Sequence, residues 1–166
     1  PPADLAILAR RTEGWAAGLQ FFHLATRGKS AEERRRIISG VGTSSRFVRE
    51  YLARNVLIDL SEELRRFLIE TCVLGRLTGD LCDRLLGRQG SARLLDELAR
   101  RQIFTAVIDE ADGSYRYHEV LRSHLDRMLV DEVGDMEARR RHQLAGELLE
   151  ECGASAEALA AYCRAE

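Results

Sequence analysis

Apolar residues recur every three or four positions through the first sixty residues, which is the spacing of one face of an α-helix. The clearest stretches are 3–12, 15–27 and 44–60. Between them, Ser30 and Glu33 have the spacing of a capping box, in which two side chains satisfy backbone N–H groups at the start of a helix. The pattern therefore predicts an all-helical segment over residues 1–60, with one helix beginning at Ser30.

Start and stop signals predict three more helices between residues 61 and 102. Ser61, Thr78 and Ser91 each stand just before an apolar stripe, and hydroxyl side chains there accept the first backbone N–H bonds of a helix. Gly87 ends the middle helix, because glycine readily adopts the left-handed conformation that closes a helix. The residues predicted to face inward are Leu64, Phe67, Leu68, Cys72, Leu81, Leu85, Leu86, Leu94, Leu95 and Leu98.

The spacing of apolar residues changes at residue 103. Residues 103–108 are mostly β-branched or aromatic, 109–114 are polar and include an Asp-Gly pair, and 115–117 alternate aromatic and charged side chains. Two short strands joined by such a turn form a β-hairpin. Helical spacing then returns from His118 to Leu129. Three helices, a hairpin and a further helix over residues 61–131 are the arrangement of a winged helix-turn-helix.

Two final helices are predicted at residues 136–152 and 154–166, joined at Gly153. They have the form of a helix pair, and no internal repeat is visible in the sequence. The predicted fold class is therefore mainly α: a helical domain, then a winged helix with one small hairpin, then further helices.

Composition narrows the class of protein. The chain has 166 residues, a net charge of −2, 45% hydrophobic residues and 31% charged residues, which is typical of a globular protein and excludes intrinsic disorder. It contains no run of about 18 apolar residues, so we expect no membrane span. It begins with two prolines and shows no charged-then-apolar leader. We therefore expect a cytoplasmic protein and a piece of a longer chain.

Cysteine spacing and known catalytic motifs predict neither a metal site nor an enzyme. The four cysteines, Cys72, Cys82, Cys152 and Cys163, form no CxxC pair, whereas zinc sites usually take their ligands from close pairs. Each lies in a helical pattern, so we expect buried free thiols. The sequence has no phosphate-binding loop, dinucleotide motif, nucleophile elbow or zinc-protease motif.

Charge argues against the DNA-binding role that a winged helix suggests. Residues 61–131 hold 11 arginines against 13 acidic residues, a net charge of −2. The predicted recognition helix, 91–102, has three arginines against two acidic residues, and the hairpin turn at 109–112 is acidic. Because phosphate contacts need a cationic face, we favour a regulatory or protein-interaction module. A stand-alone DNA-binding winged helix is the alternative.

Two places could hold a ligand or serve packing alone. His118 lies between a predicted strand and a predicted helix, where a polar side chain can face a ligand or a neighbouring domain; a partly exposed residue at a helix end is the simpler interpretation. His124, six residues on, lies on a different helix face, which excludes a two-histidine metal site. The segment 12–19 around Trp15 is typical of a helix start with small residues that allow close packing.

Four segments, taken in order, resemble MalT-like, large LuxR-type regulators. They are TEGWAAGLQ at 12–20, SRFVREYL at 45–52, the run from FL to LCD at 67–83, and YRYHEVL at 115–121. The resemblance implies a piece of a signal-transduction ATPase of the STAND class, in which a nucleotide-binding domain comes first. This chain would then supply the helical domain (1–60), the winged helix (61–131) and the start of a helical-repeat sensor (132–166).

The resemblance also implies which residues face a nucleotide. His118 matches the winged-helix histidine that contacts the β-phosphate of bound ADP in related proteins. Gly14, Trp15 and Ala16 match a motif that packs near the adenine, with Ala16 where the family has proline. The parent protein would bind ADP or ATP, and the chain itself would hold no cofactor and no catalytic residue. The implied partners are the nucleotide-binding domain and the sensor of the same protein, with DNA bound by a separate C-terminal domain, no membrane, and oligomerisation on activation.

Overall fold

The chain divides into two compact units, Pro1–Ile58 and Asp59–Glu166. The computed structural model describes residues 30, 32–34, 57–58, 60–101, 103–109 and 111–166. In the first unit it confirms the capping box: the backbone N–H of Ser30 donates to the Glu33 carboxylate at 2.8 Å, and that of Glu33 donates to the Ser30 hydroxyl at 3.3 Å. The other helices predicted over 1–60 lie outside the described residues.

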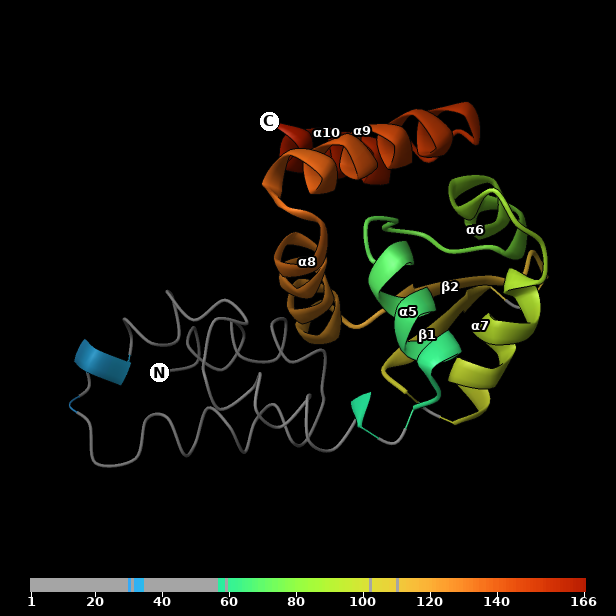
Figure 1. The fold of residues 1–166 in the computed structure, drawn as a ribbon, viewed down its shortest axis with the longest axis horizontal. Helices are drawn as coiled ribbons and strands as arrows, with labels where there is room; N and C mark the ends of the chain where they lie inside the picture. The colour runs from blue at the N-terminus through green and yellow to red at the C-terminus, as the bar shows by residue number, and fades with distance from the viewer. Residues whose placement is uncertain (1–29, 31, 35–56, 59, 102, 110) are drawn as a thin grey trace. The chain divides into compact units, whose positions relative to one another are not determined.

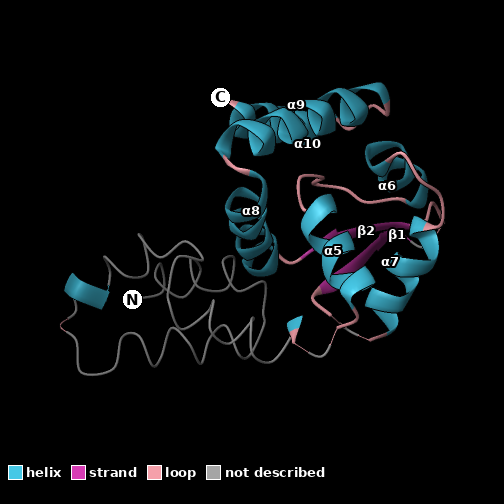
Figure 2. Cartoon of the chain, viewed as in Figure 1, coloured by secondary structure: helices cyan, strands magenta, loops and turns pink. Residues whose placement is uncertain are grey.

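The second unit begins with the winged helix that the hydrophobic pattern predicts (Figures 1 and 2). Three helices are followed by an antiparallel hairpin and a longer helix. The predicted fold class, mainly α with one small hairpin, is thereby confirmed. The elements are α5 (Glu62–Thr71), α6 (Gly79–Leu86), α7 (Ser91–Arg100), β1 (Thr105–Asp109), β2 (Ser114–Tyr117) and α8 (Glu119–Val133).

The ends of the first three helices follow the predicted signals, with one exception. The hydroxyls of Ser61 and Thr78 accept the backbone N–H groups of Leu64 and Leu81, respectively, and so cap α5 and α6. Gly87 ends α6 in the left-handed conformation. The start of α7 has no cap from its own segment. Instead the Asp83 carboxylate, on α6, accepts the backbone N–H of Ser91 at 2.9 Å and that of Gly90 at 3.3 Å.

The hairpin has a third backbone partner that the sequence pattern did not predict. β1 pairs with β2 from Thr105 opposite Tyr117 to Asp109 opposite Ser114, with a register shift between Val107 and Asp109. On its other side β2 pairs with Leu77, whose backbone exchanges two hydrogen bonds of 2.8 Å with Tyr115. The segment between α5 and α6 is thereby fixed to the hairpin.

The core of the winged helix lies where α5, α7 and α8 pack against the hairpin. Its largest side chains are fully buried leucines together with Phe67. One polar contact crosses this core: the hydroxyls of Thr71 and Tyr117 lie 2.8 Å apart, which joins the end of α5 to β2. The fully buried leucines of these helices are Leu64, Leu68, Leu95, Leu98, Leu121, Leu125 and Leu129.

The last two helices, α9 (Asp135–Glu151) and α10 (Ser155–Ala165), form the predicted helix pair. The turn between them contains Gly153 in the left-handed conformation, at φ +75°. In Figure 1 the two helices lie side by side, connected to the winged helix through α8. They belong to the same compact unit as the winged helix. The domain boundaries at 60 and 131, and the interpretation of this pair as the start of a repeat region, stay predictions.

The prediction that all four cysteines are buried is right for two and wrong for two. Cys72 and Cys82 lie in the core, and burial raises the pKa of the Cys82 thiol to about 12. Cys152 and Cys163 are exposed, because Cys152 follows the last turn of α9 and Cys163 lies on the outer face of α10. No helix in the described part of the chain is long and apolar enough to cross a membrane.

Gly146 on α9 lies directly against the Tyr162 ring of α10, so a side chain at this position would overlap the ring. A Cβ atom at Gly146 would lie 2.4 Å from Cε1 of Tyr162. We therefore expect Gly146→Ala to lower the free energy of unfolding by about 1–3 kcal/mol through overpacking. In a Tyr162→Ala background, Gly146→Ala should instead raise the free energy of unfolding by about 1 kcal/mol, because alanine forms helices better than glycine. Urea unfolding of the four proteins in this cycle measures both values; equal effects in the two backgrounds would contradict the packing argument.

Candidate functional site

His118 lies where the hairpin ends and α8 begins. It occupies the N-cap position of α8, and its backbone is held on both sides: its N–H donates to the carbonyl of Phe104 at 2.8 Å, and its carbonyl accepts the N–H of Arg122 at 2.9 Å. The imidazole is half-buried and stands edge-on to the Phe104 ring, with ring centroids 6.0 Å apart and an interplanar angle of 88°. Backbone and ring are therefore both positioned at this junction.

Phe104 supports His118 at a conformational cost. Its φ of +47° is left-handed, and among the described residues it is the single non-glycine residue with a positive φ. That conformation costs an L-residue with a bulky side chain about 1–2 kcal/mol. Such strain persists only where surrounding contacts enforce it, and it gathers at ligand and switch regions. Here it allows the Phe104 carbonyl to accept the N–H of His118.

Glu119, the first residue of α8, connects this junction to the last helix. Its carboxylate accepts a hydrogen bond from the Ser123 hydroxyl at 3.0 Å, and Arg164 on α10 donates to the same oxygen at 3.3 Å. Arg122, whose side chain is largely buried, lies 3.8 Å from the other carboxylate oxygen. An acidic residue in the first turn also suits the positive end of the helix dipole.

Further along α8, Asp126 joins the same arginine to a buried histidine. Asp126 lies 2.6 Å from Nε2 of His142 on α9, a ring that is almost fully buried, and 3.5 Å from Arg164. Burial alone raises the pKa of Asp126. The hydrogen bond and charge of His142, with the positive charges of Arg164 and Arg122, outweigh burial and hold that pKa below its ordinary value. We call these five residues the α8 polar cluster: Glu119, Arg122, Asp126, His142 and Arg164.

The α8 polar cluster is an ion-pair network rather than a metal site. Burial lowers the pKa of the Arg122 guanidinium, and the positive charge of Arg164 lowers it further. Among the described residues, no group of three or more His, Cys, Asp or Glu side chains is arranged to hold a metal ion. The network was not predicted, because its members lie on three helices and share no sequence motif.

Of the predicted site residues, the structure describes His118 alone. Gly14, Trp15 and Ala16 lie outside the described residues. Their proposed position near an adenine stays a prediction from the resemblance, as does the contact of His118 with a phosphate.

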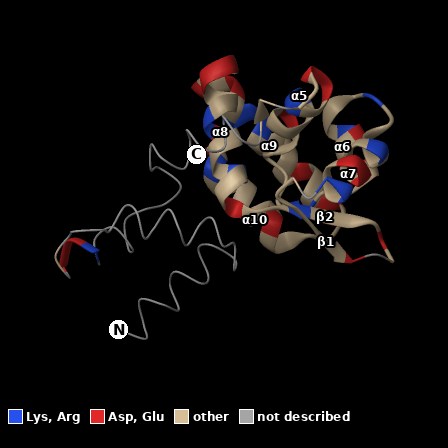
Figure 3. Cartoon of the chain, turned by 90° about the horizontal axis from the view of Figure 1, so that it is seen from below, with Lys and Arg blue, Asp and Glu red and all other residues tan. Residues whose placement is uncertain are grey.

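The surface that a winged helix would present to DNA carries mixed charge. On α7, Arg101 pairs with Glu97 at 2.7 Å and Arg93 with Glu63 at 3.2 Å, and basic and acidic residues lie interspersed on this helix (Figure 3). At the hairpin turn, Arg76 pairs with Asp112. Phosphates would have to compete with these carboxylates for the arginines, so this face lacks the cationic surplus that DNA binding needs.

The Asp126–His142 contact gives a prediction on stability and its pH dependence. Asp126→Asn should lower the free energy of unfolding by about 1–3 kcal/mol at neutral pH, because a buried charged hydrogen bond is lost. The folded-state pKa of Asp126 lies below the ordinary value of 3.8. The advantage of the carboxylate is therefore complete above that value and is lost as the pH falls through the folded-state pKa. Denaturant unfolding of both proteins across this range measures the difference.

A matched control for this test is Asp131→Asn, which changes an exposed carboxylate on the same helix and should leave stability nearly unchanged. A stability difference for Asp126→Asn that stayed constant down to the lowest pH would show that the carboxylate charge does not act as described.

Comparison with known proteins gives the same fold. A family model described as the MalT winged helix domain matches residues 53–138. The chain is 32% identical over 129 residues to serine/threonine-protein kinase PknK of Mycobacterium tuberculosis, which covers 78% of this chain and 11% of the kinase. It is 27% identical over 146 residues to HTH-type transcriptional regulator MalT of Klebsiella pneumoniae (87% of this chain, 16% of that protein). With MalT of Yersinia pestis it is 28% identical over 158 residues (94% and 17%).

The chain thus spans between 11% and 17% of the length of these relatives. The family model covers more than half of the chain and includes every element from α5 to α8. The chain belongs to the family of MalT winged helix domains.

Proposed function

We propose that this chain is the winged-helix arm of a nucleotide-dependent switch in a MalT-like transcriptional regulator. Two relatives that match most of the chain are named as HTH-type transcriptional regulators, and the family model is that of their winged helix. The arm has a regulatory role and no catalysis of its own. Slow ATP hydrolysis, and DNA binding through a separate domain, belong to other parts of the regulator.

The placement of His118 is the observation that carries this proposal. A histidine that holds a phosphate needs a fixed backbone and an accessible ring, and His118 has both: two backbone hydrogen bonds and a half-buried imidazole against Phe104. The N-terminus of the 15-residue helix α8 also favours a nearby anion. In this proposal the imidazole donates a hydrogen bond to the diphosphate of ADP bound by the neighbouring nucleotide-binding domain.

The α8 polar cluster supports a route from that contact to the following helices. Glu119 is adjacent to His118 and is bonded to Arg164 on α10, and Arg164 also contacts Asp126, the partner of His142 on α9. A displacement of α8 at His118 therefore acts directly on the α9–α10 pair. An effector bound to a sensor region that continues from this pair shifts the arm by binding one of its positions more tightly than the other.

The phosphate contact is tested in the full-length regulator. His118→Ala should speed the release of fluorescently labelled ADP by about tenfold, because a charge-assisted hydrogen bond is worth about 1.5–3 kcal/mol. His118→Asn provides a second variant that keeps a favourable N-cap residue and removes the imidazole, so it should release ADP as fast as His118→Ala. Arg127→Ala, on the exposed side of α8, is the control. Unchanged ADP release in both His118 variants would refute the assignment.

DNA binding by the winged helix itself is the second candidate, and the fold alone favours it. We expect no retardation of duplex DNA by the chain in an electrophoretic shift assay at low salt, because Arg93, Arg101 and Arg76 are paired with carboxylates and residues 61–131 carry a net charge of −2. DNA binding that weakened steeply with salt, with a dependence that corresponds to several phosphate contacts, would contradict the expectation and show that the winged helix binds DNA.

A further inference from the structure

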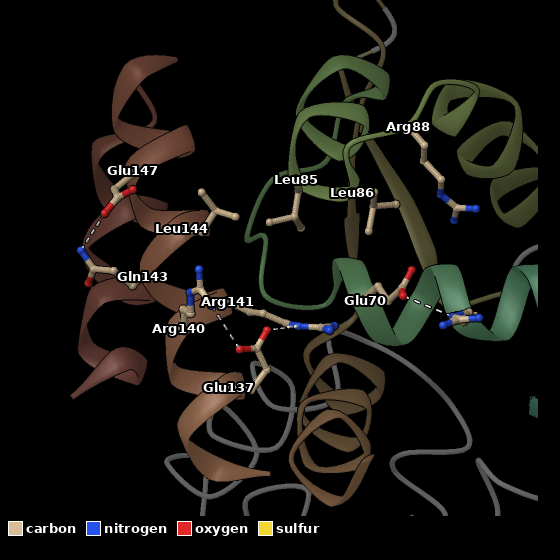
Figure 4. Close-up of a pocket in the computed structure, with 11 residues that line it drawn as sticks. Glu70, Leu85, Leu86, Arg88, Glu137, Arg140, Arg141, Gln143, Leu144 and Glu147 are labelled. Atoms are coloured by element: carbon tan, nitrogen blue, oxygen red, sulfur yellow. Dashed lines mark hydrogen bonds and ion pairs between the residues drawn. The ribbon is translucent and has the colours of Figure 1, made fainter. Parts of the chain in front are cut away.

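A groove of about 780 Å³ opens between α6 and the outer face of α9, with α5 at its base. Figure 4 shows its two walls: Leu85 and Leu86 on α6 face Leu144 on α9, and charged side chains surround them. This groove lies outside the site at His118, and none of its lining residues belongs to the α8 polar cluster.

The middle of the groove is apolar and accessible. Leu144 keeps 41% of its surface exposed, although the neighbouring positions Ala145, Leu148 and Leu149 are buried. Leu85, at the end of α6, is only half-buried and points across the groove toward Leu144 (Figure 4). Leucines left exposed on two facing helices form a strip onto which a third helix can pack.

At the rim of the groove, some arginines remain able to bind a further anion. Glu70 pairs with Arg66 at 3.3 Å, and Glu147 accepts a hydrogen bond from Gln143 at 3.0 Å. Glu137 is shared by Arg141 at 3.4 Å and Arg140 at 3.9 Å. Glu70 and Glu137 are thus paired with arginines of the groove, whereas Glu147 has a neutral amide partner. The lining still includes four arginines against three glutamates, a net charge of +1.

Two arginines on opposite walls therefore have capacity for a further anion. The side chain of Arg140 is 84% exposed and lies 3.9 Å from the Glu137 carboxylate, which is farther than Arg141 at 3.4 Å. Across the groove, Arg88 forms no close ion pair among the described residues, and its positive charge contributes to the lowered pKa of the Asp83 carboxylate. An arginine offers up to five N–H donors, so both can bind a carboxylate supplied from outside.

We propose that this groove is a docking site for an acidic amphipathic helix of a partner. The helix would place leucine-type side chains at i, i+3 or i+4 and i+7 against Leu85, Leu86 and Leu144, and its flanking carboxylates would meet Arg88 on one side and Arg140 on the other. Charge complementarity selects this occupant: the lining carries a net charge of +1, with Arg88 and Arg140 on the two sides of the apolar strip.

The test uses the whole 166-residue chain and a defined probe. The probe is a fluorescein-labelled helical peptide of about three turns with leucines at helical spacing, glutamates beside them and alanine elsewhere; a second peptide replaces each glutamate by lysine. Fluorescence anisotropy should show saturable binding of the acidic peptide and at least tenfold weaker binding of the basic one. Leu144→Glu should abolish binding of the acidic peptide, and Arg88→Glu with Arg140→Glu should weaken it by at least tenfold.

Matched controls lie elsewhere on the same unit. Leu159 on α10 is also an exposed leucine on a helix, and Arg100 on α7 is also exposed, so Leu159→Glu and Arg100→Glu should bind the acidic peptide as the unaltered chain does. The doubly charge-reversed variant should in turn prefer the lysine peptide, which a variant that merely failed to fold could not do. Binding of neither peptide, or equal binding of both, would overturn the proposal.

Two further outcomes would also overturn it. Loss of acidic-peptide binding in the control variants would place the contact elsewhere. Binding of a duplex oligonucleotide that depended on Arg88 and Arg140 would make the groove a nucleic-acid surface. Hydrogen exchange provides an independent measure of position: the acidic peptide should protect backbone amides in α6 and in the middle of α9 and leave those of α7 unchanged.

Discussion

The second unit of this protein depends on the way α8 holds its neighbours through partly buried charge. Asp126 and the buried His142 lie 2.6 Å apart, and Arg164 bonds both to Asp126 and to Glu119, which lies two turns earlier on α8. Ion pairs in such surroundings add little net stability compared with apolar packing, but removing one partner costs about 1–3 kcal/mol. They therefore fix one arrangement of α8, α9 and α10 against others. This specificity matters in a helix that joins a winged helix to a helix pair.

The winged helix of this chain has the fold of a DNA-binding domain, but its surface carries mixed charge. Its helices and hairpin follow the usual order, yet Arg93 and Arg101 pair with glutamates and the turn of the hairpin is acidic. Fold and function are separable for this reason: the buried leucines determine the architecture, whereas exposed residues determine what it binds. Membership of the MalT winged helix family agrees with a regulatory role.

Local chemistry explains which parts of the fold could be predicted from the sequence. Helix starts at Ser61 and Thr78, the end at Gly87 and the hairpin all depend on residues within a few positions of one another, and all are found where expected. The pairing of Leu77 with Tyr115 and the capping of α7 by Asp83 depend on contacts between separate elements. A hydrophobic pattern carries no information on such contacts, which is also why the exposure of Cys152 was missed.

At the candidate site, the position of His118 could be predicted from the sequence, whereas the residues around it could not. Its place between a strand and a helix could be predicted from a change of period, whereas its contact with a phosphate stays a prediction from the resemblance. The left-handed Phe104 beside it could not be predicted, because nothing in residues 103–105 indicates a positive φ; its carbonyl accepts the N–H of His118. The α8 polar cluster likewise appears only when three helices are assembled.

The strand order of the small sheet bears on whether two copies of this protein can pair edge to edge. Because β2 lies between β1 and Leu77, β1 is the outer strand of the sheet within the described part of the chain, and Val107 and Ile108 on it are about half exposed. An open, apolar edge is a template for pairing with a second chain. Here the register shift after Val107 interrupts the regular ladder, and acidic residues follow at 109, 110 and 112. A bulge and charged residues at an edge both disfavour such pairing.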